Sequence, residues 1–184
     1  MPQNNVLVSE DGTPMITDFG NAILEQGTMQ FTETVKQNGF TPRWTAPEIL
    51  DEREVRQSKE ADVYALGMTV LEVITGRVPY SHINNTVTLI KAVAIKHEIP
   101  KRPEDIPSDS KHGDALWSLL QRCWKYKIES RPKADQVAET MKGITRSGLV
   151  PGNAAPGTLP KSNILKSGVD TLLAGIRSAS KSRK

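Results

Sequence analysis

The apolar run from Asp62 to Thr75 constrains the fold of this sequence more than any other feature. At helical spacing the run places apolar side chains on nearly every face, namely Val63, Tyr64, Leu66, Met68, Val70, Leu71, Val73 and Ile74. A helix without a polar face belongs in the middle of a core. Gly76 is a natural C-terminal stop, and Pro79 prevents the helix from resuming. The sequence therefore predicts a domain built around one central helix that opens at Asp62.

Weaker patterns predict four further helices in the body of the chain and one hairpin before them. The helices are expected at 46–50, 86–96, 115–124 and 134–144. Two short apolar strands at 6–8 and 15–17 flank Asp11-Gly12, a strong signal for a two-residue turn. With that turn, Val6 faces Thr17 and Asn5 faces Asp18. The expected fold class is mainly α with one short β-hairpin.

The charge divides the chain into an acidic body and a basic end. Of 24 basic and 21 acidic residues, seven basic and one acidic fall after residue 145, so the body carries a net charge of −3 and the end +6. An acidic body is a poor candidate for a nucleic-acid surface. We expect a compact domain at 1–145, a Gly/Pro-rich linker at 146–162 and a basic tail at 163–184. A disordered tail is favoured over an amphipathic helix that contacts a membrane or a partner helix.

Several site classes are disfavoured by the composition. One cysteine, Cys123, excludes an internal disulfide framework, and its place on an apolar stripe favours a buried thiol. The three histidines show no metal-ligand spacing. The sequence shows neither a signal-peptide pattern nor an apolar run of membrane-spanning length, so a cytoplasmic location is expected.

Five short motifs follow one another along residues 1–145. They are Asn5-Val6-Leu7-Val8, Thr17-Asp18-Phe19-Gly20, Ala46-Pro47-Glu48, Asp62-Val63-Tyr64-Ala65-Leu66-Gly67, and Cys123-Trp124 followed by Arg131-Pro132. Together they resemble the C-terminal lobe of the eukaryotic protein kinases. Trp44-Thr45 and Cys123-Trp124 resemble the tyrosine-kinase-like branch. The resemblance implies part of a catalytic domain that transfers the γ-phosphate of ATP to Ser or Thr, or to Tyr, hydroxyls of proteins.

The same resemblance implies a magnesium site at Asn5 and Asp18. A carboxylate and an amide oxygen are hard donors of the kind that Mg²⁺ accepts, and the expected hairpin brings the two side chains together. Leu7 would form the floor of the adenine pocket, and Thr17 and Asp18 would line the nucleotide side of the cleft. The alternative is that Asn5 and Asp18 only flank a turn.

Three charged residues have structural roles by the same resemblance. Glu48 and Arg131 would form an ion pair that braces the substrate loop, and Asp62 would accept hydrogen bonds from the catalytic-loop backbone. The alternatives are two independent surface charges and a helix-start carboxylate favoured by the helix dipole.

Residues 20–45 lack apolar periodicity and resemble the activation segment of kinases. Candidate phosphorylation sites are Thr28, Thr32 and Thr34, for which Lys36 and Arg43 are the local cations. The expected substrate loop, next to the acceptor, comprises Thr41, Pro42, Arg43 and Trp44. A plain solvated loop remains the alternative for each candidate threonine.

The 184 residues also depart from the kinase pattern. The position of the catalytic base, five residues before the magnesium-binding Asn, falls before Met1, and the sequence contains no glycine-rich phosphate loop and no strand with an ATP-contacting lysine. We therefore expect no kinase activity and little ATP or Mg²⁺ binding from this chain alone. Two alternatives stay open: a pseudokinase-like binding module, and an interaction protein that acts through its basic end. The expected partner is a protein substrate or docking protein.

Overall fold

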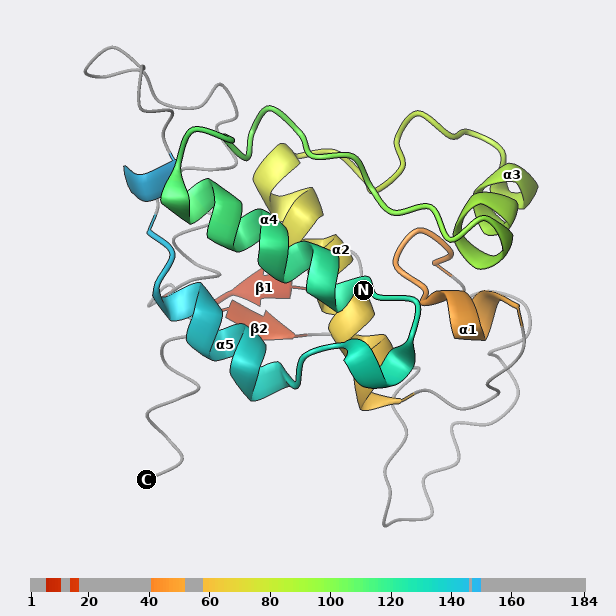
Figure 1. Ribbon diagram of the computed structural model, residues 1–184, viewed down its shortest axis with the longest axis horizontal. Helices are drawn as coiled ribbons and strands as arrows, with labels where there is room; N and C mark the ends of the chain where they lie inside the picture. The colour runs from red at the N-terminus through yellow and green to blue at the C-terminus, as the bar shows by residue number, and fades with distance from the viewer. Residues whose placement is uncertain (1–5, 11–13, 17–40, 52–57, 146, 150–184) are drawn as a thin grey trace.

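The structure, a computed structural model, describes residues 6–10, 14–16, 41–51, 58–145 and 147–149 of the chain. The strands are β1 (Val6–Val8) and β2 (Pro14–Ile16), and the helices are α1 (Pro47–Leu50), α2 (Lys59–Thr75), α3 (Thr86–Ile90), α4 (Lys111–Cys123) and α5 (Ala134–Lys142) (Figure 1). A π-helical turn at Lys91–Ile95 continues α3, and 3-10 turns lie at Ile128–Ser130 and Ser147–Leu149. The described part is mainly helical with one two-stranded sheet, which confirms the expected fold class.

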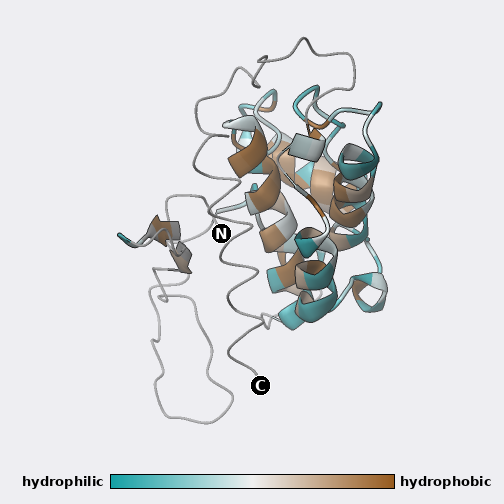
Figure 2. Ribbon diagram, turned by 90° about the vertical axis from the view of Figure 1, so that its left-hand side faces the viewer, coloured by the Kyte–Doolittle hydropathy of each residue, from teal (hydrophilic) through white to brown (hydrophobic). Residues whose placement is uncertain are grey.

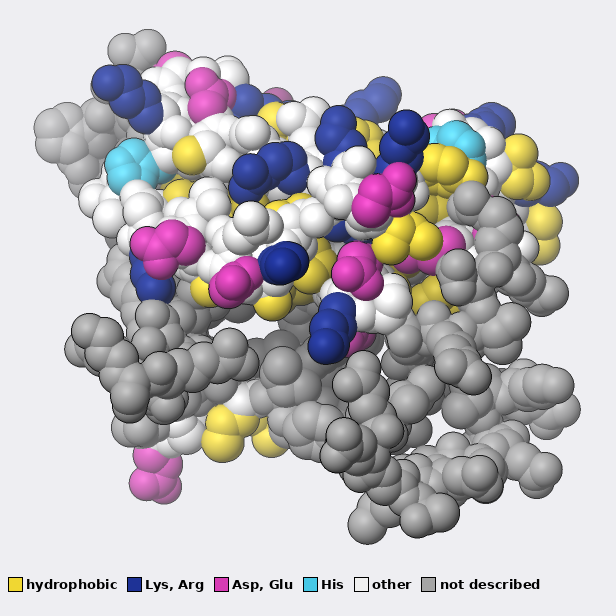
Figure 3. All heavy atoms as spheres, turned by 60° about the horizontal axis from the view of Figure 1, so that its bottom comes forward, with side chains coloured by type: hydrophobic (Ala, Val, Ile, Leu, Met, Phe, Trp, Pro, Cys, Tyr) yellow, Lys and Arg dark blue, Asp and Glu magenta, His cyan; other side chains and the backbone are white. Residues whose placement is uncertain are grey.

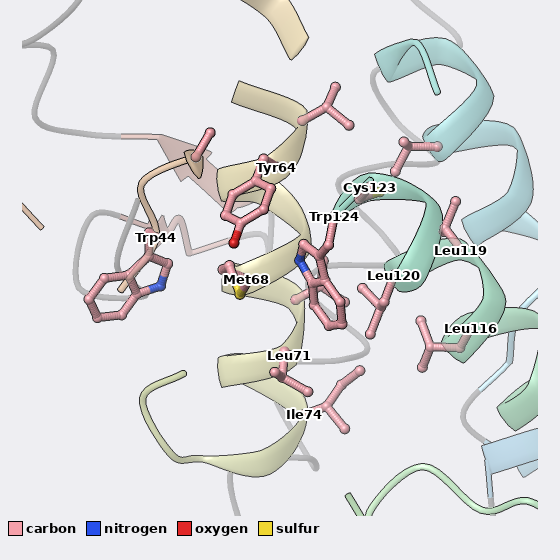
Figure 4. Packing of buried hydrophobic residues seen from close by; sticks show 14 of the residues in the cluster. Trp44, Tyr64, Met68, Leu71, Ile74, Leu116, Leu119, Leu120, Cys123 and Trp124 are labelled. Atoms are coloured by element: carbon pink, nitrogen blue, oxygen red, sulfur yellow. The ribbon is translucent and has the colours of Figure 1, made fainter. Parts of the chain in front are cut away.

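Helix α2 is the centre of the packed body, as its sequence predicts. Helix α4 crosses α2, and α5 lies alongside α4 (Figure 1). Side chains of the two crossing helices gather in one cluster that includes Met68, Leu71, Ile74, Leu116 and Leu120 (Figure 4). Burial of apolar area of this kind supplies most of the favourable free energy of folding. Among the described residues, no helix has both the length and the hydropathy required to cross a membrane.

The start of α2 differs from the expected one. The helix begins at Lys59 because Ser58 caps it, its side chain accepting a hydrogen bond from the Ala61 backbone N–H at 3.1 Å. Asp62 therefore lies within the first turn and does not open the helix. The end was predicted correctly: Gly76 takes a left-handed conformation with φ of 64°, and its N–H donates to the Glu72 carbonyl at 2.7 Å.

Two other helices also differ from their expected bounds. Helix α4 begins at Lys111 rather than at 115, because the Ser110 side chain accepts a hydrogen bond from the Gly113 N–H at 3.2 Å. The helix expected at 86–96 is present, but its second half is π-helical, a geometry often found at functional sites.

The hairpin register differs by one residue from the expected register. Val6 pairs with Ile16, Leu7 with Met15 and Val8 with Pro14. Glycine suits the left-handed position of longer connections as well as that of a two-residue turn, so Asp11-Gly12 alone does not fix the register. Proline, which donates no backbone hydrogen bond, begins β2, a position that sheets tolerate. The hairpin lies to one side of the helical body (Figure 2).

The packed part of the chain continues at least to Leu149, which is buried. The Ser110 hydroxyl donates to the Gly148 carbonyl, and the Thr145 N–H donates to His112 Nδ1 at 3.1 Å. These contacts join the 3-10 turn at Ser147–Leu149 to α4. The rest of the expected linker and the basic tail, residues 150–184, lie outside the described residues.

Trp124 packs closely against α2 at a glycine. A Cβ atom added to Gly67 would lie 2.7 Å from Trp124 Nε1 and 2.9 Å from the Cβ of Cys123. In the described part of the chain, this Nε1 is the one buried side-chain nitrogen or oxygen without a hydrogen-bond partner. Beside it, burial raises the pKa of the Cys123 thiol to about 11, which confirms the expected buried thiol.

Substitution of Gly67 should show how strongly this contact determines stability. We expect Gly67→Ala to lower the free energy of unfolding by about 1–3 kcal/mol, since the added methyl group overpacks a rigid contact. Gly143→Ala is the matched control, because its added Cβ would meet only the Thr140 carbonyl at 3.5 Å. Urea unfolding followed by circular dichroism measures both, and equal stability of the two variants would contradict the close approach.

Candidate functional site

The expected substrate loop folds as a tight turn that leads into α1. The Thr41 carbonyl accepts hydrogen bonds from the Trp44 backbone N–H at 3.1 Å and from the Thr45 hydroxyl at 2.9 Å. Ala46 then takes an extended conformation, and Pro47 begins α1, where its missing N–H has no cost. The loop is therefore closed by its own hydrogen bonds and ends in a defined helix start.

Arg43 connects this loop to the segment between α2 and α3. Its guanidinium donates to the Pro79 carbonyl at 2.9 Å, to the Tyr80 carbonyl at 2.7 Å and to the Ile83 carbonyl at 2.6 Å. The planar, multidentate guanidinium suits such a cluster of acceptors, which an ammonium group could not serve equally. These three bonds hold the guanidinium against the carbonyls of this segment.

Trp44 connects the same loop to the buried helix. Its indole Nε1 donates to Glu72 Oε2 at 3.2 Å, and Trp44 and Glu72 are only 7% and 2% exposed. A buried carboxylate requires hydrogen-bond donors to offset its lost hydration. The sequence alone assigns no role to Glu72, although an acidic residue in the middle of an apolar run signals such a contact.

The ion pair expected between Glu48 and Arg131 is present and fully buried. Arg131 Nη1 lies 2.6 Å from Glu48 Oε1, and Nη2 lies 2.7 Å from Oε2, with side chains 0% and 2% exposed. This two-point geometry is the strongest arrangement of a guanidinium and a carboxylate. It joins α1, directly after the substrate loop, to the segment before α5.

Arg131 uses its remaining donors on backbone carbonyls. Nε donates to the Lys125 carbonyl at 2.8 Å, and Nη1 donates to the Glu60 carbonyl at 3.1 Å. The guanidinium carbon also lies 5.2 Å from the centre of the Tyr64 ring, within the range of a cation–π contact. Burial raises the pKa of the Tyr64 hydroxyl to about 12, so this ring stays neutral. One side chain thus joins α1, the start of α2 and the segment after α4.

Other expected site residues are described only in part. Asp62 keeps an exposed surface, yet its surroundings partly desolvate the carboxylate and raise its pKa above the ordinary value. Leu7 is 53% exposed on the hairpin. The remaining expected positions lie outside the described residues: Asn5, Thr17, Asp18, Thr28, Thr32 and Thr34. Among the described residues, no cluster of three or more His, Cys, Asp or Glu side chains could hold a metal.

Comparison with known proteins identifies the family of this chain. The family model for the protein kinase domain matches residues 1–141. The chain belongs to the protein kinase domain family. Its residues therefore correspond to part of a kinase catalytic domain. Intact domains of this family use ATP and Mg²⁺ and act on proteins.

Individual kinases from distant organisms are similar to this chain. The dual specificity protein kinase shkC of Dictyostelium discoideum is 31% identical over 141 residues, which cover 77% of this chain and 26% of that protein. The serine/threonine-protein kinase PkaA of Streptomyces coelicolor is 31% identical over 154 residues, or 82% of this chain and 26% of that protein.

A tyrosine kinase is similar to the same extent. The tyrosine-protein kinase transforming protein Fps of an avian sarcoma virus is 34% identical over 145 residues, or 77% of this chain and 25% of that protein. The chain thus spans about a quarter of the length of these curated relatives.

Removal of one partner of the buried ion pair should destabilise the fold strongly. We expect Glu48→Gln to lower the free energy of unfolding by about 3–5 kcal/mol, because it leaves the Arg131 charge buried without compensation. The control is Glu139→Gln, which removes a solvent-exposed pair with Lys142 at 2.9 Å. This substitution should lower the free energy of unfolding by less than about 1 kcal/mol. Chemical denaturation compares the two variants, and a small effect in both would show that the pair does not hold the structure.

Replacement of Arg43 should loosen the segment between α2 and α3. We expect Arg43→Lys to lower stability by about 1–3 kcal/mol, since a single ammonium leaves partly buried carbonyls without donors. It should also speed hydrogen exchange at the Ile83 N–H, which donates to the Tyr80 carbonyl at 2.8 Å. Arg77→Lys, at an exposed pair with Asp105, is the matched control. Unchanged exchange at Ile83 would mean that Arg43 does not order this segment.

Proposed function

We propose that residues 1–145 form the metal- and substrate-binding lobe of a protein kinase domain that phosphorylates Ser or Thr hydroxyls of proteins. The observation that most supports this role is the fixed position of the substrate loop. Arg43 and Trp44 attach the loop to the α2–α3 segment and to α2 itself, and the Glu48–Arg131 pair secures the helix that follows it. Phosphoryl transfer depends mainly on positioning and charge stabilisation, so a rigid acceptor platform suits it.

The preference for Ser and Thr rests on Thr41. The resemblance to Ser/Thr kinases assigns to this position a threonine that steadies the catalytic base, and the structure describes Thr41 at the start of the closed turn. The relatives named above include a serine/threonine kinase, a dual specificity kinase and a tyrosine kinase. Tyr hydroxyls are therefore the alternative acceptors.

Asn5 and Asp18 are the proposed magnesium ligands, and Leu7 and Thr17 the proposed contacts to the nucleotide. The donor set fits the metal, because Mg²⁺ takes one or two protein oxygens and completes its shell with phosphates and water. When bound, the metal neutralises charge on the phosphates. The exposed side chain of Leu7 leaves apolar surface free for an adenine ring. Asp62 would orient the catalytic-loop backbone through hydrogen bonds, as the family resemblance implies.

The 184 residues supply only part of a complete kinase site. They contain no glycine-rich phosphate loop and no ATP-contacting lysine strand. The groups that cover the phosphates and abstract the acceptor proton would have to come from other residues. We therefore propose that the isolated 184-residue chain has no phosphoryl-transfer activity of its own.

Metal binding tests the proposal directly. The isolated chain is expected to bind weakly, so the full chain is titrated to millimolar Mn²⁺ and ATP and free Mn²⁺ is followed by electron paramagnetic resonance. Asp18→Ala should weaken this binding further, by about tenfold or more. Asp109→Ala removes an exposed carboxylate elsewhere and should have no effect. Equal binding by the wild-type chain and by Asp18→Ala would contradict the metal assignment.

A phosphorylation assay tests whether the 184 residues alone can transfer phosphate. The isolated chain with Mg²⁺, ATP and a general protein substrate should incorporate no phosphate. Incorporation that disappears in Asp18→Ala would show that the 184 residues suffice for catalysis, and would overturn their proposed dependence on other residues.

A further inference from the structure

A surface hollow of about 280 Å³ lies between the turn after the π-helix and the end of α4. It is lined by His97, Ile99, Gln121, Trp124, Lys125 and Tyr126. A smaller space next to it shares four of these side chains and also reaches Pro47 of α1 and Tyr64 of α2. We call the larger hollow the α4 groove. Its volume and its aromatic and aliphatic walls suit one large apolar side chain.

Both walls of the α4 groove are held by groups from the interior. On one side, the Tyr80 hydroxyl donates to the Glu98 carbonyl at 2.9 Å, and the Glu98 N–H donates to the Ala92 carbonyl at 2.9 Å. On the other side, Arg131 holds the Lys125 carbonyl at 2.8 Å. A groove with fixed walls loses little conformational entropy when it binds a ligand.

The backbone of one wall is strained. His97 has a φ of 55°, a left-handed conformation that is unfavourable for a non-glycine residue. This conformation accompanies a close ring contact, in which the His97 and Tyr126 ring centres are 3.7 Å apart at 43°. Residues kept in such conformations cluster at functional sites. Ile99 and Tyr126, which line the groove, are 40% and 36% exposed.

Positive charge is concentrated around the α4 groove. Residues 96–101 and 121–127 contain five exposed basic side chains, Lys96, Lys101, Arg122, Lys125 and Lys127, against one acidic side chain, Glu98. The rest of residues 1–145 holds 12 basic and 19 acidic residues, a net charge of −7. On the face drawn in Figure 3, lysine and arginine side chains lie beside apolar ones, with acidic side chains between them. A basic rim around an apolar floor complements an acidic ligand with an apolar anchor.

We propose that the α4 groove binds an acidic segment of another protein that carries an aromatic or aliphatic side chain. The apolar side chain enters between Ile99, Trp124 and Tyr126, and the flanking carboxylates approach Lys125 and its basic neighbours. The basic tail of this chain is a poor occupant, because like charges would repel it. The proposal does not depend on phosphoryl transfer, because it concerns residues apart from Asn5, Asp18 and the substrate loop.

The test uses the full chain and a random Glu/Tyr copolymer as the probe, with binding measured by biolayer interferometry at about 0.15 M salt, where distant charges are screened. Lys125→Glu should weaken binding by about tenfold, since it reverses a charge on the wall. Lys111→Glu makes the same charge change at the first residue of α4, about 20 Å along the helix, and should leave the affinity within about twofold.

A second pair of variants tests the apolar anchor. Ile99→Ala should weaken binding by about threefold to fivefold, whereas Ile95→Ala, which removes a 68% exposed side chain outside the groove lining, should not. Polyglutamate, which lacks an anchor, should bind more weakly than the copolymer. Circular dichroism verifies that each variant is folded.

Hydrogen exchange locates the binding site independently of substitution. The copolymer should protect amides in residues 96–101 and 121–127. The proposal would be overturned if Lys125→Glu and Lys111→Glu lost affinity for the copolymer equally, or if polyglutamate and the copolymer bound equally well. Protection confined to residues 146–184 would overturn it as well. The two groove segments could also be protected before the probe is added. If deletion of residues 150–184 removed that protection, the groove would belong to the chain's own tail and the proposal would be wrong.

Discussion

The buried pair between Glu48 and Arg131 joins two parts of the chain that are 83 residues apart. Its two charges have lost nearly all contact with water, so each is tolerated only because the other is present and correctly oriented. Around this pair, carbonyls from the start of α2 and from the segment after α4 complete the donor set of the guanidinium. Loss of either partner therefore affects the substrate loop and one wall of the α4 groove together.

The central helix has a second role besides filling the core. Glu72 carries a carboxylate into the apolar interior and receives the indole N–H of Trp44, so the helix also holds the substrate loop by a polar contact. Polar contacts inside a core add less to net stability than to the choice of one arrangement over others. The position of the loop is thus determined by a directional bond rather than by apolar packing alone.

The sequence predicted the elements of this fold better than their boundaries. The helix around Met68 was predictable because its apolar pattern leaves no polar face, whereas its start was not, since the cap comes from Ser58 outside that pattern. The hairpin was predictable, but its register was not, because Asp11-Gly12 suits more than one connection length. The Glu48–Arg131 pairing followed from a family resemblance, as no local pattern relates such distant residues. The contacts of Arg43 could not be predicted, because its acceptors are backbone carbonyls. Every residue carries one, so the sequence does not mark which carbonyls an arginine will bind.

The single thiol of the chain lies where α2 and α4 meet, beside Trp124. A thiol whose pKa is about 11 is almost wholly protonated at neutral pH and is screened from reagents by the helices around it. Since the sequence holds no second cysteine to compete for a label, and where reclosing is faster than labelling, the rate at which an added disulfide reagent modifies Cys123 gives the fraction of molecules in which this part of the core is open. Modification of Cys123 therefore reports directly on the opening of the core where α2 and α4 meet.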